Sequence, residues 1–301
     1  MSRPLSATRS TQQAKVVKAR RLGTTRPLEL TIIYLLLCLS AAFLLLPLLW
    51  AIAASFSPNE KVFEYAYPFS WRALLPAEFT LEAYQALFAR GFGRTIFNSL
   101  MLGLVTVFVG GFVNALAGFA FARFQFWGKN VIFIAVVMSS FLVPGDLTAI
   151  PRYILVKDFG WVNTWQGLIV PGLASSLVIY LFRQFFAELP QELIDAARVD
   201  GATYFQLFLR VILPISKPAL LTAALLLFLS QWDSFFWPLV VASDPKLQVV
   251  QVAISQAVGQ YQTQWNQLLA GSMLAAIIPI LLVLPFQSYY VRGITGAGLK
   301  E

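Results

Sequence analysis

The sequence predicts an all-α membrane protein with six transmembrane helices and both termini on the cytoplasmic side. Hydrophobic residues make up 58% of the 301 residues, and charged residues only 12%. A soluble domain usually has about 25% charged residues. The charges also leave long uncharged stretches between them, and about 20 apolar residues are enough for a helix to cross a bilayer.

Six stretches fit such helices, and they divide the chain into three parts. Residues 1–29 form a basic tail that we expect to be disordered, 30–290 the transmembrane domain, and 291–301 a cytoplasmic tail. The predicted spans are residues 30–54, 97–122, 130–143 with an extension towards 150, 162–182, 218–242 and 268–290.

The distribution of positive charge predicts the orientation. With the N-terminus inside, the inner segments carry 15 Lys and Arg residues and the outer segments carry 7. Cytoplasmic loops of membrane proteins hold the excess of positive charge. A cleaved signal peptide ending near Ala51-Ile52-Ala53 is the alternative for the first span, but its apolar run is longer than the usual 7–15 residues.

Composition excludes several kinds of chemistry. The chain has no histidine, and Cys38 is its only cysteine, so Cys/His zinc sites, disulfide scaffolds and histidine acid–base catalysis are ruled out. We expect no metal site and no catalytic residues. The net charge of +8 does not indicate nucleic-acid binding, because seven basic residues gather before the first span, as in a cytoplasmic membrane anchor.

Two outer segments are predicted to fold. Residues 55–96 should form a small cap with a helix that starts at Thr80 and ends at Gly91. Residues 247–265 show an apolar stripe at helical spacing and predict one helix, lying on the membrane, on its own chain or against an external protein partner. The stripe consists of Leu247, Val250, Ile254, Val258, Tyr261 and Trp265.

The longest inner loop, residues 182–220, predicts two helices. Pro190 suits the first turn of a helix, and Gly201 suits its end. A second apolar segment runs from Tyr204 and stops at Pro214. The exposed alanines of the first helix would fit a groove on another protein.

This loop resembles the EAA loop of ABC-importer permeases. Asp195-Ala196-Ala197, three residues, Gly201, nine residues and Val211-x-Leu213-Pro214 match the family pattern, with Asp and Val in place of Glu and Ile. The longer string is similar to the carbohydrate-uptake branch, which includes the smaller permease subunit of the maltose importer. The resemblance covers residues 28–300.

The resemblance implies a transport subunit of a bacterial inner membrane that is not an enzyme. Its loop would dock into a separate ATPase dimer, which binds ATP and Mg, because this chain has no phosphate-binding loop. The other implied partners are a second, homologous permease and an extracytoplasmic solute-binding protein. The implied coupling residues are Glu192, Asp195, Ala196, Ala197, Asp200, Gly201, Tyr204, Phe205 and Pro214.

Asp233 is the ionisable residue inside the fifth predicted span, where such residues often have functional roles. A carboxylate beside aromatic rings suits a sugar pathway, although a hydrogen bond across helices would also explain it, and related permeases commonly have Asn there. The candidate pathway residues are Asn114, Trp232, Asp233, Phe235, Phe236 and Trp237, and the candidate contacts for the binding protein are Val250, Ile254, Tyr261 and Trp265.

Three readings of the function follow from these residues. The first is a permease for a mono-, di- or oligosaccharide. The second is an ABC permease for glycerol 3-phosphate or a polyol, which would share the fold and most motifs. The third is a secondary transporter coupled to a cation through Asp233, which would need no docking helix.

Overall fold

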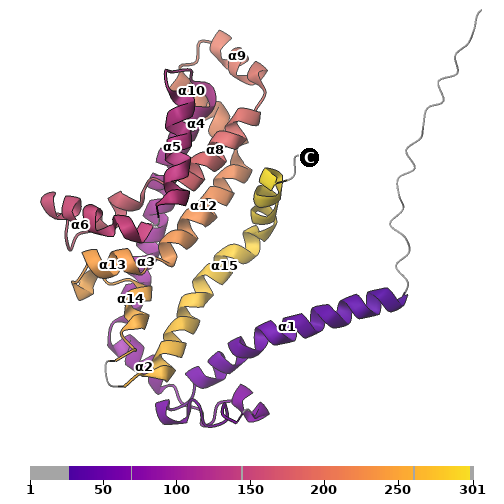
Figure 1. The fold of residues 1–301 in the computed structure, drawn as a ribbon, viewed down its shortest axis with the longest axis vertical. Helices are drawn as coiled ribbons and strands as arrows, with labels where there is room; N and C mark the ends of the chain where they lie inside the picture. Colours follow the sequence, from indigo (N-terminus) through magenta and orange to yellow (C-terminus); the bar gives the residue numbers. More distant parts are fainter. Residues whose placement is uncertain (1–26, 69, 144, 260–261, 299–301) are drawn as a thin grey trace, which may run out of the picture. The chain divides into compact units, whose positions relative to one another are not determined.

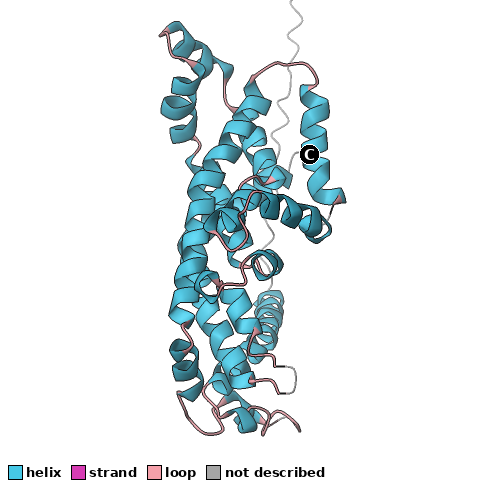
Figure 2. Cartoon of the chain, turned by 90° about the vertical axis from the view of Figure 1, so that its left-hand side faces the viewer, coloured by secondary structure: helices cyan, strands magenta, loops and turns pink. Residues whose placement is uncertain are grey.

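The chain is helical throughout the part that its computed structural model describes. This part is residues 27–298 without 69, 144, 260 and 261, and its side chains are described for 30–286 without 140, 141 and 146. No strand occurs among these residues (Figure 2), which confirms the all-α prediction. The predicted disordered tail lies outside them, except for residues 27–29, which begin the first helix.

The helices vary widely in length. Their bounds are α1 Pro27–Ser55, α2 Glu82–Ala89, α3 Phe92–Val105, α4 Gly111–Arg123, α5 Lys129–Leu142, α6 Ala149–Asp158, α7 Trp165–Ile169, α8 Ser176–Glu188, α9 Gln191–Val199, α10 Tyr204–Leu207, α11 Leu213–Ile215, α12 Lys217–Trp232, α13 Phe236–Val241, α14 Val250–Ser255 and α15 Trp265–Gly298. Two π-helical turns, Thr106–Gly110 and Phe208–Ile212, join α3 to α4 and α10 to α11.

The chain divides into two units, Met1–Leu49 and Trp50–Glu301. In its described part the first unit consists of residues 27–49 of α1, with apolar side chains exposed on all sides. A helix that is apolar all round is stable in lipid rather than in water. Leu30–Ser55 accordingly has the length and composition of a membrane span, as predicted.

In the second unit, α4, α8 and α12 lie side by side (Figure 1). Phe119 of α4 packs with Phe182 and Phe186 of α8 in one buried cluster. The two backbones approach closely at Gly118, where a Cβ atom would lie 2.5 Å from Cβ of Phe182. The close approach explains why a residue without a side chain occupies this position.

Within the described residues, three helices have the length and composition of spans: Leu30–Ser55, Phe92–Arg123 and Trp265–Phe286. Two pairs with a sharp bend would raise the number to five. One pair joins Trp165–Gly172 to Ser176–Glu188 at 46°, and the other joins Tyr204–Ile215 to Lys217–Trp232 at 86°.

Three of the predicted spans are therefore wrong as continuous helices. The fourth, 162–182, is broken between Gly172 and Ser176, where its two halves bend by 46°. The third ends at Leu142 and does not extend to 150, because α6 starts separately at Ala149. The fifth ends at Trp232, and α13 follows as a new helix. Pro238 has no N–H group, so it fits the first turn of α13 better than the interior of a longer helix.

Two boundaries near the C-terminus also differ from the prediction. The last helix continues to Gly298 instead of ending at 290. The helix predicted over 247–265 is wrong, because α14 covers only Val250–Ser255. The chain then reverses at Gly259, where a Cβ atom would lie 2.5 Å from the carbonyl oxygen of Gln262.

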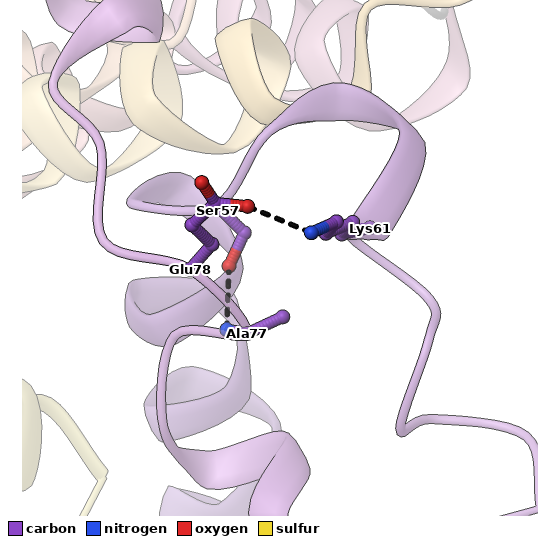
Figure 3. A network of polar contacts seen from close by, with 4 residues as sticks. All are labelled: Ser57, Lys61, Ala77 and Glu78. Carbon is purple, nitrogen blue, oxygen red and sulfur yellow. Dashed lines mark hydrogen bonds and ion pairs between the residues drawn. The ribbon is translucent and has the colours of Figure 1, made fainter.

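The predicted cap between α1 and α3 is confirmed as a folded segment. Figure 3 shows two of its contacts: the Ala77 N–H donates to Ser57 Oγ at 3.2 Å, and Lys61 Nζ lies 2.7 Å from Glu78 Oε2. Helix α2 begins after Thr80, whose hydroxyl accepts from the Glu82 N–H, and Gly91 ends it in the left-handed conformation.

Candidate functional site

The loop predicted to couple to an ATPase, residues 190–215, is called the coupling loop, and it begins with α9. Pro190 precedes the helix, and Glu192 lies in its first turn, where a carboxylate is favoured by the helix dipole. Ile194 is buried in the α4–α8–α12 core and Ala197 packs against it. Glu192, Asp195, Ala196 and Asp200 remain exposed, so α9 has one face held by its own chain and one face free.

Gly201 ends α9 as predicted. Its φ of +82° is in the left-handed region that glycine adopts without strain. The Gly201 N–H donates to the Arg198 carbonyl at 3.1 Å, and the Ala202 N–H donates to the Ala197 carbonyl at 3.0 Å. These two bonds form a Schellman motif, which fixes the direction in which the chain leaves the helix.

The second half of the loop is fixed by side-chain contacts. Thr203 and Gln206 form a reciprocal capping box at the start of α10. The Tyr204 ring lies beneath the Arg198 guanidinium at 4.4 Å and against Phe124 at 4.9 Å. Phe205 is exposed.

Pro214 does not end the helical segment, which continues to Ile215. The wider turn at Phe208–Ile212 precedes it. This turn accommodates a proline that supplies no N–H group and whose ring crowds the carbonyl one turn earlier.

Arg123 connects this loop to the bundle. From the end of α4, its guanidinium donates to the carbonyls of Phe186 and Leu189, and to Gln191 Oε1 at 3.0 Å. Arg123 thus links the start of α9 to the ends of α4 and α8. These contacts could not be predicted from the sequence, because the partners of Arg123 lie more than 60 residues away along the chain.

A cavity of about 850 Å³ lies where several helices break. It is bounded by the π-turn after α3, by Val143, Gly145 and Thr148, by residues 172–178 and by the end of α12. The breaks expose backbone and polar groups that continuous helices would bury, as at the solute sites of many transporters. The polar side chains that line it are Thr106, Ser139, Thr148, Arg152, Ser175, Ser176, Ser230, Gln231 and Asp233.

Asp233 is exposed at the C-terminus of α12 and lines this cavity. It lies after the end of a helix, not in the middle of a continuous span as predicted. A carboxylate at this end of a helix is disfavoured by the helix dipole, by roughly 0.3–1 kcal/mol. Helix stability therefore does not explain why it is there.

Asn114 is fully buried, and its amide forms hydrogen bonds to the π-turn before α4 and to the segment between α7 and α8. Its Nδ2 donates to the carbonyls of Gly110 at 2.6 Å and Leu173 at 2.8 Å, and its Oδ1 accepts from the Ser175 N–H at 2.8 Å. The amide has no surface open to a solute in this structure. Its geometry is that of a structural bond beside the cavity.

The aromatic residues predicted to surround Asp233 do not lie together in the structure. Trp232 is buried and stacks on Phe228 at 5.7 Å, away from the cavity lining. Trp237 donates to the Gly167 carbonyl at 3.0 Å and lies 5.2 Å below the Arg152 guanidinium. Phe235 and Phe236 are exposed, outside the lining.

The residues predicted to contact a binding protein differ in how exposed they are. Val250 is fully buried and offers no free surface, whereas Ile254 packs beside Gly271 in the same cluster and is half-buried. Tyr261 lies outside the described residues. Trp265 is exposed at the start of α15. The described part of the stripe is thus covered by its own chain at Leu247, Val250 and, in part, Ile254, and exposed at Val258 and Trp265.

Two lining residues were missed by the sequence analysis. Thr106 is buried in the π-turn, and its hydroxyl has no hydrogen-bond partner in the described part of the chain. Arg152 belongs to α6, which the sequence did not separate from the third span; its guanidinium donates to Thr148 Oγ1 at 3.3 Å. The position of Arg152 directly after the apolar third span was the signal in the sequence that could have identified it.

Comparison with known proteins identifies the family to which this chain is related. Residues 16–292 match the family described as "Binding-protein-dependent transport system inner membrane component". The chain is 29% identical to the arabinooligosaccharides transport system permease protein of Bacillus subtilis, over 91% of this chain and 95% of that protein. It is 32% identical to the sn-glycerol-3-phosphate transport system permease protein of Salmonella typhi, over 86% and 93%.

The fold agrees with this match. A bacterial ABC transporter involved in the import of alginate contains a chain that superimposes with a TM-score of 0.73 and 22% identity, over 86% of this chain and 95% of that one. Proteins of this kind are permease subunits, which are not enzymes. The chain belongs to the family of inner-membrane permease components of binding-protein-dependent ABC transport systems.

Proposed function

We propose that this chain is one of two homologous permease subunits of an importer for a carbohydrate. In this proposal it spans the inner membrane six times, with both termini in the cytoplasm. Helix α5 then serves as a short third span, and each bent pair counts as one. The ratio of 15 to 7 basic residues supports this orientation.

The coupling loop is the observation that carries the proposal. One face of α9 is held in the core by Ile194, while Asp195 and Ala196 face outward. A stand-alone transporter has no use for such a rigid, exposed helix. We assign the exposed face to docking on a cytoplasmic ATPase, which holds ATP and Mg.

The cavity supplies the pathway in this proposal. Hydroxyl and amide groups can exchange hydrogen bonds with the hydroxyls of a sugar, and Asp233 offers two acceptor oxygens. Arg152 is the observation that keeps an anion such as glycerol 3-phosphate as the second candidate. A solute-binding protein on the outer face delivers the solute.

The test uses the complete importer in proteoliposomes. We expect Asp233→Asn to slow uptake of the solute and to leave co-purification of the ATPase unchanged, with Asp158→Asn as a matched control outside the cavity. Uptake that is unchanged by Asp233→Asn would contradict the pathway assignment. Uptake that persists without ATP would contradict the importer itself.

A further inference from the structure

A group of basic and aromatic side chains lies apart from the cavity, at the ends of α4, α5 and α8. We call it the basic–aromatic cluster; it comprises Phe126, Trp127, Lys129, Phe133 and Arg183. The Arg183 guanidinium lies 4.9 Å over the Phe133 ring, and Lys129 is within electrostatic reach of Arg183.

The position of the cluster follows from contacts of its neighbours. Phe124, at the start of the same connection, packs against Tyr204 of the coupling loop at 4.9 Å. Arg123 bonds to Gln191 at the start of α9. The cluster therefore lies at the end of the bundle that carries the coupling loop.

Its positive charge is not neutralised. The Lys129 ammonium is partly buried, and it forms no hydrogen bond or ion pair with any described residue. The Arg183 guanidinium donates to Gln184 but meets no described carboxylate within ion-pair distance. Two partly buried cations that repel each other are stabilised by an anion bound between them.

Beside these cations, two aromatic side chains are exposed. Trp127 is 97% exposed and Phe126 is 43% exposed. Tryptophan concentrates at the level of the lipid headgroups, where its ring contacts apolar groups and its N–H stays in a polar environment. The surface thus fits a ligand with an anionic head and an apolar body.

We propose that the basic–aromatic cluster binds the headgroup of an anionic phospholipid such as phosphatidylglycerol. Its phosphate lies between Lys129 and Arg183, and Trp127 and Phe126 contact the upper part of its acyl chains. The inference rests on the proposed function only for its placement at the cytoplasmic surface of the membrane.

The test measures lipid binding to the purified importer. The detergent-solubilised complex is titrated with phosphatidylglycerol, and bound lipid is counted by native mass spectrometry. We expect Lys129→Gln/Arg183→Gln to weaken binding about 30-fold, since each cation near an anionic headgroup contributes about fivefold and the two factors multiply. Lys129→Arg/Arg183→Lys should retain binding. Arg72→Gln/Lys157→Gln removes two exposed cations elsewhere and should have no effect.

Four results would overturn the proposal. The first is that wild type and the double Gln variant bind phosphatidylglycerol equally, and the second is that wild type binds zwitterionic phosphatidylcholine as well as phosphatidylglycerol. The third is that millimolar inorganic phosphate displaces the lipid. The fourth is that the double Gln variant loses the ATPase but retains the lipid. The last would make the cluster a protein interface. Failure of the proposed function would show differently, as absence of an ATPase from the wild-type complex.

Discussion

Gly201→Ala adds one methyl group to the residue that ends the coupling helix. No atom lies within 4 Å of the position of the new Cβ, so the methyl group meets no steric obstacle. The cost comes from the backbone, because a φ of +82° is unfavourable for alanine by about 1–2 kcal/mol. Relaxation to negative φ would instead break the bonds from Gly201 and Ala202 that close α9.

Either response lowers the population of the docking orientation. A cost of about 1–2 kcal/mol corresponds to an affinity for the ATPase that is about 5–30-fold weaker. The assay measures binding of the ATPase to the permease pair in detergent, followed by uptake in proteoliposomes. Both should fall, while the amount of permease in the membrane remains unchanged.

Gly91→Ala is the matched control. Gly91 has a φ of +86°, and its Cβ position is equally open, so the backbone cost is the same. It lies between α2 and α3, outside the coupling loop. The reasoning is refuted if the two variants bind the ATPase equally well.

Three further predictions concern stability. Gly118→Ala should lower the melting temperature of the purified chain, because the new Cβ would lie 2.5 Å from Phe182 Cβ, at a cost of about 1–3 kcal/mol. Gly111→Ala is the control and should leave the melting temperature unchanged, because its Cβ would lie 3.8 Å from the nearest atom. Equal melting temperatures of the two variants would contradict the close packing at Gly118. Asn114→Leu should destabilise by about 1–3 kcal/mol through the lost amide bonds, and unchanged denaturation would show that they contribute nothing.

The third concerns the cap. The hydrogen bond from Lys61 lowers the pKa of the Glu78 carboxyl and raises the pKa of the Lys61 ammonium. The ion pair should therefore protect the cap from proteolysis at pH values above the ordinary pKa of glutamate. This protection should be lost in acid, as the pH falls through the lowered pKa of Glu78, and in alkali, as the pH rises through the raised pKa of Lys61. Glu78→Gln should remove the acid-side change; an unaltered pH profile would contradict it.

The sequence predicted those features that depend on local signals. The apolar runs located α1, the α3–α4 helix and α15, since lipid requires long stretches without charge. Gly201 located the end of α9, because few other residues adopt positive φ without strain.

Features that depend on distant contacts were not predicted. The end of α12 at Trp232 lies inside an apolar run with no local stop signal except Pro238, and prolines are common in membrane helices. The stripe over 247–265 had helical spacing, but the close approach of Gly259 to Gln262 reverses the chain there. The role of Asn114 required knowing that residues 173–175 lie beside it.

The most direct test of the importer assignment is affinity purification of the tagged chain from its native membrane in mild detergent, with the co-purified proteins identified by mass spectrometry. If the assignment is right, an ABC ATPase and a second permease co-purify in stoichiometric amounts with the wild-type chain and with Gly91→Ala, and less ATPase co-purifies with Gly201→Ala. Recovery of the wild-type chain alone, or as a homo-oligomer without an ATPase, would contradict it.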